Sequence, residues 1–197
     1  MKVIETIDKI KTFNTELGYI KNNKYIENTK IILSMIPDYF FKIPASSTGK
    51  YHPSFSLGEG GLVRHTKVAV KIGYTLLQSK TTNNFTDNEK DLIIISLILH
   101  DSFKSGVIEE KYCRVDHPLI VTNFLKENKD KFTFSDQELN YICECINTHM
   151  GEFNTDYRGN VVLPLPQTKH QRFVHMCDLL SSKKFLNINF NGNEIIE

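Results

Sequence analysis

The chain has 197 residues, of which 40% are hydrophobic, which is enough for one hydrophobic core, so we expect a single domain. Its 24 Lys and Arg residues nearly balance 23 Asp and Glu residues, and the resulting net charge of +1 excludes a strong overall field for binding nucleic acid or membranes. We therefore expect neither duplex DNA nor a membrane as a partner.

The start of the chain, its apolar runs and its cysteines bear on the cellular compartment. The N-terminus carries acidic residues where a signal peptide needs an apolar stretch, and no apolar run reaches the roughly 18 residues of a membrane span. The four cysteines, Cys113, Cys143, Cys145 and Cys177, form no C-x-x-C pair. The sequence thus predicts a soluble, cytoplasmic protein whose reduced cysteines serve in packing.

The first half of the chain is predicted to be helical, with one long loop. Apolar residues recur at helical spacing over residues 2–17 and again over 25–41, where Pro37 is expected to bend or end the helix. Residues 42–61 are rich in Pro, Ser and Gly, which is typical of an ordered loop. A helix is expected after this loop, and its apolar, inward face includes His65.

The most informative stretch is the nearly continuous apolar run over residues 92–99, which His100 and Asp101 follow directly. A run of this length fits either a buried helix or a central strand. A Thr-x-x-Glu sequence just upstream can form a capping box, which favours a helix over about residues 87–101. Because its interior is apolar all round, we expect this helix at the centre of the fold, with the His-Asp pair where it emerges into a site.

The second half is predicted to contain three more helices. Asp116 is expected to cap the first, which begins with His117 and a proline and runs to about residue 128. A second capping box begins the next helix, whose apolar stripe ends at His149. The last helix, over about 167–182, carries Asp178 beside its packing face. The predicted fold class is therefore all-α.

Six residues at the inner ends of these helices carry imidazole or carboxylate side chains: His65, His100, Asp101, His117, His149 and Asp178. One histidine on an apolar face is more often a hydrogen-bonded core residue than a ligand, but the joint pattern favours a metal site. Nitrogen and oxygen ligands without thiolate suit a divalent ion such as Mn, Fe, Co, Ni, Zn or Mg. Such an ion lowers the pKa of bound water and screens phosphate charge, so the inventory indicates phosphoester hydrolysis. The P-loop and G-x-S-x-G motifs are absent from the sequence.

The order of these residues resembles the HD-domain metal-dependent phosphohydrolases, whose pattern is H…HD…D with two further histidines in the two-metal members. The matching segments are Gly61-Leu62-Val63-Arg64-His65-Thr66, Leu99-His100-Asp101-Ser102-Phe103-Lys104, Asp116-His117-Pro118, Thr148-His149-Met150 and Val174-His175-Met176-Cys177-Asp178. The resemblance implies a compact helical bundle with its core at about 50–182, N-terminal helices over 1–41 and a C-terminal tail over 183–197. The segment after His149 is similar to HD domains of bacterial 3′→5′ exoribonucleases and nucleotide phosphodiesterases.

The resemblance also implies roles for individual residues. It implies one or two metal ions per chain, held by His65, His100, Asp101, His117, His149 and Asp178. If a second ion is present, His117 and His149 would hold it, and Asp101 would bridge the two ions. Lys104 stands at the family's usual offset from the His-Asp pair and would contact the substrate phosphate. Phe103 replaces the glycine that is usual at its position, which changes the backbone freedom of this loop.

Other residues are candidates for contacting the substrate. Arg64, Arg114 and Arg158 are possible phosphate clamps, because a guanidinium can bind phosphate through two parallel hydrogen bonds. His52 lies in the loop before the His65 helix and is expected near the mouth of the site. His175 is expected to orient the Asp178 helix or to line the pocket and not to bind metal.

The expected function is hydrolysis of a phosphodiester in a cyclic or short oligomeric nucleotide by metal-activated water, with Asp101 and Lys104 as catalytic residues. The partner would be a nucleotide or short oligonucleotide substrate. Two alternatives stay open: a nucleoside 5′-monophosphate phosphatase, and a non-catalytic HD module that binds a nucleotide or a protein. Retention of all six ligand types argues against the non-catalytic module, which has no need of them. The sequence leaves the oligomeric state open.

Overall fold

The computed structural model describes residues 7–50, 52–186 and 188–196. These ranges are mainly helical, which confirms the predicted all-α class. The α-helices are α1 (Lys9–Thr12), α2 (Asn14–Leu17), α3 (Asn23–Met35), α4 (Gly61–Gln78), α5 (Asp87–Leu99), α6 (His117–Glu127), α7 (Asp136–Thr148) and α8 (Lys169–Ser181). The shorter elements are the 3₁₀ helices η1 (Asp38–Phe41), η2 (Ser54–Ser56) and η3 (Lys129–Lys131) and the strands β1 (Phe190–Asn191) and β2 (Glu194–Ile195).

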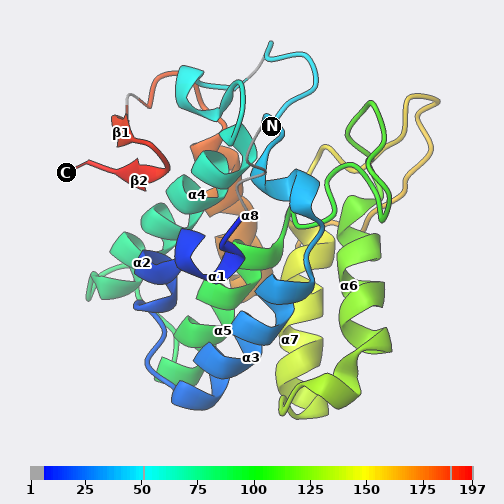
Figure 1. The fold of residues 1–197 in the computed structure, drawn as a ribbon. Helices are drawn as coiled ribbons and strands as arrows, with labels where there is room; N and C mark the ends of the chain where they lie inside the picture. Colours follow the sequence, from blue (N-terminus) through cyan, green and yellow to red (C-terminus); the bar gives the residue numbers. More distant parts are fainter. Residues whose placement is uncertain (1–6, 51, 187, 197) are drawn as a thin grey trace.

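Helix α5 lies at the centre of the fold, as the sequence predicts (Figure 1). All of its residues from 91 to 99 are buried, and α3, α4, α7 and α8 pack against it. The predicted capping box is present: Thr86 Oγ1 accepts a hydrogen bond from Glu89 N, and the Glu89 carboxylate accepts one from Thr86 N. The helix ends at Leu99, so His100 and Asp101 form the turn that follows it instead of its last residues.

The N-terminal segment forms the two short helices α1 and α2 instead of one helix over 2–17. The break is at Phe13, whose fully buried ring packs against the rings of Phe40 and Phe41. Burial of a phenylalanine ring contributes more than the hydrogen bond of one helical residue, so packing decides the local backbone here. The start of the predicted helix, residues 1–6, lies outside the described residues.

Helix α3 ends before Pro37, as predicted. Ile36 is extended, with ψ of 142°, because a proline ring disfavours helical backbone in the residue before it. The chain continues as η1, where the buried Tyr39 hydroxyl donates a hydrogen bond to Gly106 O and accepts one from Ser105 N. This tyrosine therefore fixes the loop that follows the His-Asp pair.

Helices α6 and α7 begin where the sequence predicts, but one predicted cap is wrong. Helix α6 starts at His117 with a proline in its first turn, and α7 has the predicted capping box of Ser135 and Glu138. The Asp116 carboxylate makes no cap hydrogen bond and instead accepts two from the Arg114 guanidinium, each at 2.8 Å. A bidentate charged pair is stronger than a single cap hydrogen bond, so this carboxylate binds Arg114 and does not cap the helix.

The segment after α8, predicted as a tail, folds into the antiparallel pair β1 and β2. This hairpin packs on the start of α4: the ring of Phe190 lies 5.5 Å from that of Phe55, and the Glu194 carboxylate is 2.6 Å from Lys67 Nζ. Lys67 is fully buried and also pairs with Glu16 at 3.3 Å. The buried ammonium of Lys67 thus joins the hairpin, α2 and α4 through ion pairs.

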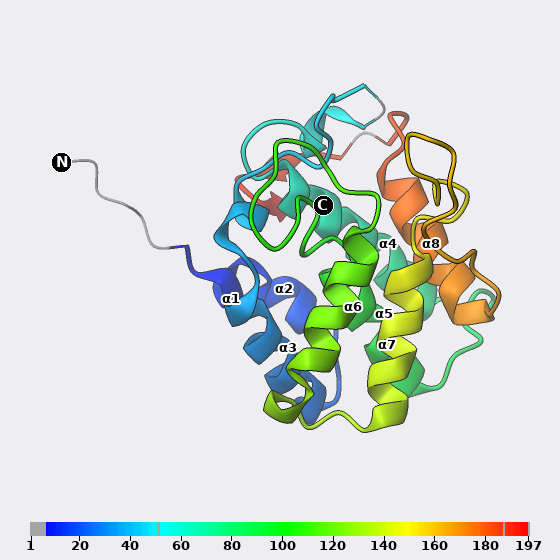
Figure 2. The ribbon, with the colours of Figure 1, turned by 90° about the vertical axis from the view of Figure 1, so that its right-hand side faces the viewer.

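The loops before α4, before α6 and after α7 gather at one end of the bundle, at the top of both ribbon views (Figures 1 and 2). Figure 2 also shows α6 and α7 side by side below these loops. The starts of α4 and α6 and the ends of α5, α7 and α8 therefore lie at this end of the bundle, which we call the loop-bearing end.

Three of the four cysteines lie in the core. Cys143, Cys145 and Cys177 are buried, as expected for packing residues, and burial raises the pKa of the Cys143 thiol to about 11. No helix in the described ranges has both the length and the apolar character that crossing a membrane requires.

Candidate metal centre

The six predicted ligands come from five helices and meet at the loop-bearing end of the bundle. The structure places them in the second turn of α4, directly after α5, at the start of α6, directly after α7 and in the last turn of α8: His65, His100 and Asp101, His117, His149, and Asp178. The first five are at most 1% exposed, and the side chain of Asp178 is 16% exposed. Residues up to 113 positions apart in the chain thus form one buried cluster.

Two overlapping groups of ligand atoms are close enough to hold metal ions. In the first, one ligand atom each of His65, His100 and Asp178 lies within 4.8 Å of the others; we call these residues the open half. The Nε2 atoms of the two histidines lie 3.0 and 3.4 Å from Asp178 Oδ1. The same atoms lie 3.6 and 3.5 Å from Asp101 Oδ2. Together with Asp101, the open half therefore presents two imidazoles and two carboxylates to one point.

The second group lies on the other side of Asp101. Ligand atoms of His100, Asp101 and His149 lie within 4.8 Å of one another. His117 joins them, because its Nε2 is 2.8 Å from Asp101 Oδ1 and 3.2 Å from His149 Nε2. We call His117 and His149 the enclosed half, and Asp101 lies between the two halves. Asp101 faces the open half through Oδ2 and the enclosed half through Oδ1, which is the placement of a bridging carboxylate.

Backbone carbonyls fix the proton of three imidazoles on the nitrogen that faces away from the centre. The Nδ1 atoms of His100, His117 and His149 lie 2.7, 2.6 and 2.8 Å from the carbonyl oxygen three residues earlier. A carbonyl oxygen only accepts hydrogen bonds, so each Nδ1 carries the hydrogen. In its neutral form, each ring therefore presents an Nε2 lone pair to the centre.

The proton of His65 is also held on Nδ1, in this case by a side chain. Ser181 Oγ donates its single hydrogen to Asp178 O at 2.7 Å and lies 3.1 Å from His65 Nδ1. The hydroxyl must therefore accept a hydrogen bond from Nδ1, which leaves the Nε2 lone pair of His65 facing Asp178. Four imidazole lone pairs and two carboxylates thus converge on one small volume.

Such a convergence of acceptors requires positive charge at its centre. His100 Nε2 and Asp101 Oδ1 are buried and have no hydrogen-bond partner within the described part of the chain. Leaving buried groups unpaired is costly, and coordination of a cation removes that cost. The donor set of nitrogen and oxygen atoms fits a divalent metal, and an Nδ1 held by a second group is typical of histidine ligands. These buried His and Asp residues could therefore hold a metal ion.

The carboxylates of the centre are charged at neutral pH. Burial alone would raise the pKa of Asp101, but the Lys104 ammonium and His100 hold it well below its usual range. Burial would likewise raise the pKa of Asp178, and the nearby His100 and His65 hold it well below its usual range. Both carboxylates are therefore ready to bind a cation without first losing a proton.

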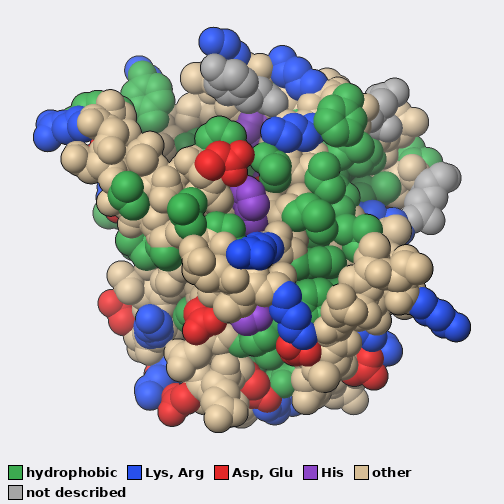
Figure 3. All heavy atoms as spheres, turned by 180° about the vertical axis from the view of Figure 1, so that it is seen from behind, with side chains coloured by type: hydrophobic (Ala, Val, Ile, Leu, Met, Phe, Trp, Pro, Cys, Tyr) green, Lys and Arg blue, Asp and Glu red, His purple; other side chains and the backbone are tan. Residues whose placement is uncertain are grey.

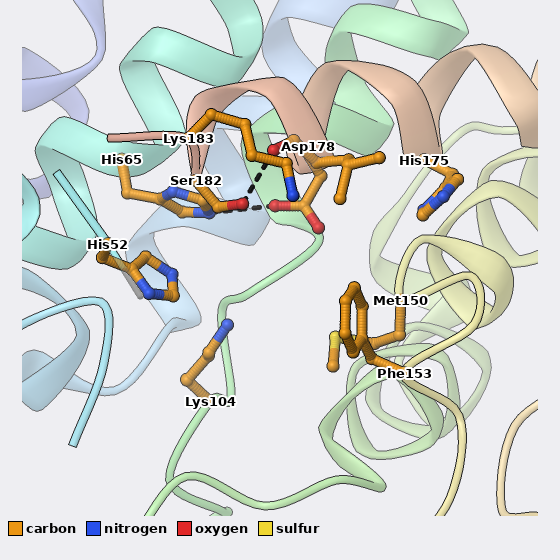
Figure 4. Close-up of a pocket in the computed structure, with 10 residues that line it drawn as sticks. His52, His65, Lys104, Met150, Phe153, His175, Asp178, Ser182 and Lys183 are labelled. Atoms are coloured by element: carbon orange, nitrogen blue, oxygen red, sulfur yellow. Dashed lines mark hydrogen bonds and ion pairs between the residues drawn. The ribbon is translucent and has the colours of Figure 1, made fainter. Parts of the chain in front are cut away.

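A pocket of about 520 Å³ opens on the open half (Figure 4). Its lining residues are His52, His65, Lys104, Met150, Phe153, His175, Asp178, Leu179, Ser182 and Lys183. Of the six predicted ligands, only His65 and Asp178 are among them. Seen from behind, the molecule shows histidine side chains at its surface near the middle of the face, with Lys or Arg side chains close by (Figure 3). The centre is thus reached through its open half.

Lys104 and His52, both predicted to face the substrate, lie in this pocket. Lys104 Nζ is 2.7 Å from Asp101 Oδ2, so its ammonium faces the metal centre as well as the pocket. The ring of His52 lies 5.5 Å from that of His65, and its buried Nδ1 has no partner among the described residues. Burial, helped by the nearby His65 and Lys104, lowers the pKa of His52 to about 4, so this ring is neutral at pH 7.

His175 lines the pocket without joining the ligands, as predicted. Its Nδ1 donates a hydrogen bond to His149 O at 2.7 Å, and its Nε2 lies 3.4 Å from the Glu152 carboxylate. The ring lies against Gly151, where even a Cβ atom would clash with it and where φ is +55°. His175 thereby ties α8 to the loop after α7.

The structure does not bring the three predicted phosphate-binding arginines to the pocket. Arg64 donates hydrogen bonds to two backbone carbonyls of the loop before α4. Arg114 forms ion pairs with Glu110 and Asp116. Arg158 lies on an exposed turn over the ring of the preceding tyrosine. Their partners explain their positions without a substrate, so the geometry does not support their role as phosphate clamps.

Several residues of the site are not singled out by the sequence. Ser181 stands three residues after Asp178 on one helix, and this spacing was a usable signal for a hydrogen-bonded neighbour. Phe153 and Lys183 gave no signal, because they follow helix ends and the path of a loop is not encoded by periodicity. The pocket wall is therefore a finding of the structure.

No protein-family model, no curated protein and no solved structure matches this chain. The residues of the centre, their distances and the order of the motifs along the chain are the observations that bear on function.

Proposed function

We propose that this protein is a metal-dependent phosphohydrolase of the HD type that cleaves a phosphodiester of a cyclic or short oligomeric nucleotide. The observation that carries the proposal is the convergence of four imidazole Nε2 lone pairs on the buried carboxylates of Asp101 and Asp178. A core histidine needs a hydrogen-bond partner at each ring nitrogen, whereas a metal ligand has one nitrogen held by a partner and the other aimed at a point that several ligands share. The H…HD…D order of these residues supports the same conclusion.

The proposal includes two divalent ions, one in each half of the centre, with Asp101 between them. The open-half residues would hold the first ion, and His117 and His149 would hold the second. Two such ions, when bound, can lower the pKa of a water molecule and clamp the attacking and leaving oxygens of a phosphodiester. Asp101 suits the bridging role because its two oxygens face different groups of imidazoles.

The pocket residues would guide the substrate phosphate to the open half. Lys104 and Lys183 place two cationic side chains in the wall, and a cation there attracts a phosphate that carries negative charge. His52 is neutral at pH 7 and has a buried nitrogen without a partner, so it can make a hydrogen bond to a phosphate oxygen or hydroxyl. These three residues would bind and orient the group that reacts.

One observation favours a second candidate, a nucleoside 5′-monophosphate phosphatase with a single metal ion. The ion pair of Lys104 with Asp101 Oδ2 supplies positive charge next to the bridging carboxylate. If this ammonium stays in place, Asp101 needs less charge from a second metal. The metal count of the purified protein separates the two candidates.

The test is elemental analysis of the purified protein, followed by assays on cyclic nucleotides, dinucleotides and nucleoside 5′-monophosphates with Mn²⁺ or Mg²⁺. We expect about two divalent ions per chain and faster hydrolysis of the diesters. His100→Ala and Asp101→Ala should each abolish hydrolysis while leaving the helical circular dichroism largely intact. Asp130→Ala, a change at an exposed carboxylate in η3, serves as the matched control and should keep full activity.

Two results would overturn the proposal. One is a metal content near zero together with no thermal stabilisation by Mn²⁺, Fe²⁺, Ni²⁺ or Zn²⁺, because a ligand of the folded state must raise its apparent stability. The other is activity of the Asp101 variant within about tenfold of wild type, which is too small a loss for a bridging ligand.

A further inference from the structure

The pocket above the open half has two chemically different sides. Figure 4 shows His52, Lys104 and Lys183 on one side and Met150 and Phe153 on the other. The first side is polar and includes two ammonium groups. The second is apolar and belongs to the loop that follows α7. A ligand that fills the pocket must therefore combine an anionic group with a flat or apolar one.

Phe153 is the most unusual residue of the apolar side. Its side chain is 56% exposed although it is a large aromatic, and among the described residues no other ring stacks on it. An exposed aromatic that lines a pocket leaves a face free for a planar ligand. Met150 and Leu179 extend this apolar wall without covering it.

Phe153 is exposed but its backbone is held on both sides. Before it, Gly151 packs against the ring of His175, and Phe153 N donates a hydrogen bond to Met150 O at 3.1 Å. After it, the buried Asn154 donates from Nδ2 to Leu163 O at 2.9 Å. Anchors on both sides pre-organise the ring, which lowers the entropy cost of stacking on it.

We propose that Phe153 is a specificity-determining residue that stacks on the nucleobase of the substrate, with Met150 beside it, while the phosphate lies at the polar side of the pocket. This inference rests on the proposed function for the identity of the ligand. In this inference, the apolar wall of the pocket is what makes the protein prefer a nucleotide over a phosphoester without a base. Stacking on a protein aromatic is tolerant of the base, so this wall selects the presence of a base more than its identity.

The test compares the binding of a nucleoside 5′-monophosphate and of ribose 5-phosphate, which carries the same phosphate without a base. Isothermal titration calorimetry on the Mn²⁺-loaded protein gives both dissociation constants for the wild type and for variants. Phe153→Ala should weaken nucleotide binding roughly tenfold, in the range expected for one lost base stack, and leave ribose 5-phosphate binding within about twofold of wild type. Phe153→Trp should keep the preference for the nucleotide, because it restores a planar ring.

Tyr157→Ala is the matched control, since this tyrosine is an 89% exposed aromatic on the same loop that does not line the pocket. It should leave both dissociation constants unchanged. The inference is overturned if Phe153→Ala weakens both ligands equally, if it changes neither, or if the wild type shows no preference for the nucleotide. Because the readout is binding, a protein that binds the nucleotide in this way but hydrolyses nothing would contradict the proposed function and leave this inference standing.

Discussion

The open and enclosed halves of the centre use the same side-chain chemistry but differ in access to solvent. His65 and Asp178 of the open half line the 520 Å³ pocket. His117 and His149 of the enclosed half are at most 1% exposed and do not line it. The halves share Asp101, whose oxygens face one half each. Under the proposed function, identical ligand types would therefore have different tasks: the open half would contact the substrate, and the enclosed half would hold a metal ion on the side away from the pocket.

This difference also separates what each half contributes to stability. Ligands of the enclosed half are surrounded by protein, so an unmet lone pair there has no water to satisfy it. His65 and Asp178 of the open half can be hydrated from the pocket. Changes in the enclosed half should consequently alter both metal content and folding, whereas changes around the open half should act mainly on the substrate.

The largest effect is expected from His117→Gln and His149→Gln. Glutamine keeps polarity and comparable bulk but is a poor ligand for these metals, so each variant should lower the metal content from about two ions per chain to about one. Phosphodiester hydrolysis should fall by more than the roughly hundredfold typical of changes around a metal site. Elemental analysis and kcat/KM measure the two quantities.

His170→Gln is the control for these variants, because His170 stacks on Tyr141 outside the pocket, with ring centroids 4.1 Å apart. It should keep both metal ions. A wild-type stoichiometry of one, with both enclosed-half variants still active, would restrict the centre to a single metal and favour the monophosphatase.

The second prediction concerns Lys104, the cation beside the open half. Lys104→Ala should lower kcat/KM roughly ten- to hundredfold, because it removes a charged hydrogen-bonding partner of the substrate phosphate. The metal content should stay the same, since the variant frees Asp101 Oδ2 from its ion pair. Lys111→Ala, on the same loop but exposed, should have no effect. Loss of metal from the Lys104 variant would show that this lysine supports the centre and does not serve the substrate.

The two halves also show what the sequence predicts and what it does not. The six ligands follow from helix periodicity and motif order, because each stands at a fixed place relative to the end of a helix that buries an apolar face. The walls of the pocket do not follow. Phe153 and Lys183 lie in segments after helix ends. Arg114, predicted as a phosphate clamp, pairs with Asp116, the residue predicted to cap α6. Whether a side chain turns into the pocket or pairs with a neighbour is decided by packing in three dimensions, which the periodicity of a sequence does not show.

The third prediction is pH-dependent stability of the metal-free protein. Burial lowers the pKa of His149 to about 4 in the folded protein, from an ordinary value of 6.5. Between these pH values the unfolded chain binds a proton at this residue and the folded chain does not, so stability falls as the pH is lowered through this window. Lowering the pH from 7 to 5 should therefore reduce the free energy of unfolding of wild type by about 2 kcal/mol more than that of His149→Gln. Denaturant unfolding with EDTA measures this difference, and equal losses in both proteins would contradict it.

The smallest effect is expected at the support of His65. The other three imidazoles are held by backbone carbonyls, which mutation does not remove, whereas His65 Nδ1 is held by the side chain of Ser181. Ser181→Ala deletes this hydrogen bond and frees the ring to rotate or to place its proton on Nε2, the nitrogen that faces Asp178. The metal affinity of the open half should then fall about tenfold, at the lower end for such supporting groups, and the enclosed half should keep its ion. Competition with a chelator measures the two affinities separately. Ser34→Ala is the matched control, because this exposed serine of α3 also donates a hydrogen bond to a carbonyl three residues earlier and lies outside the pocket. If Ser181→Ala released both ions equally, the two halves would not be independent sites, and the different tasks assigned to them would have to be abandoned.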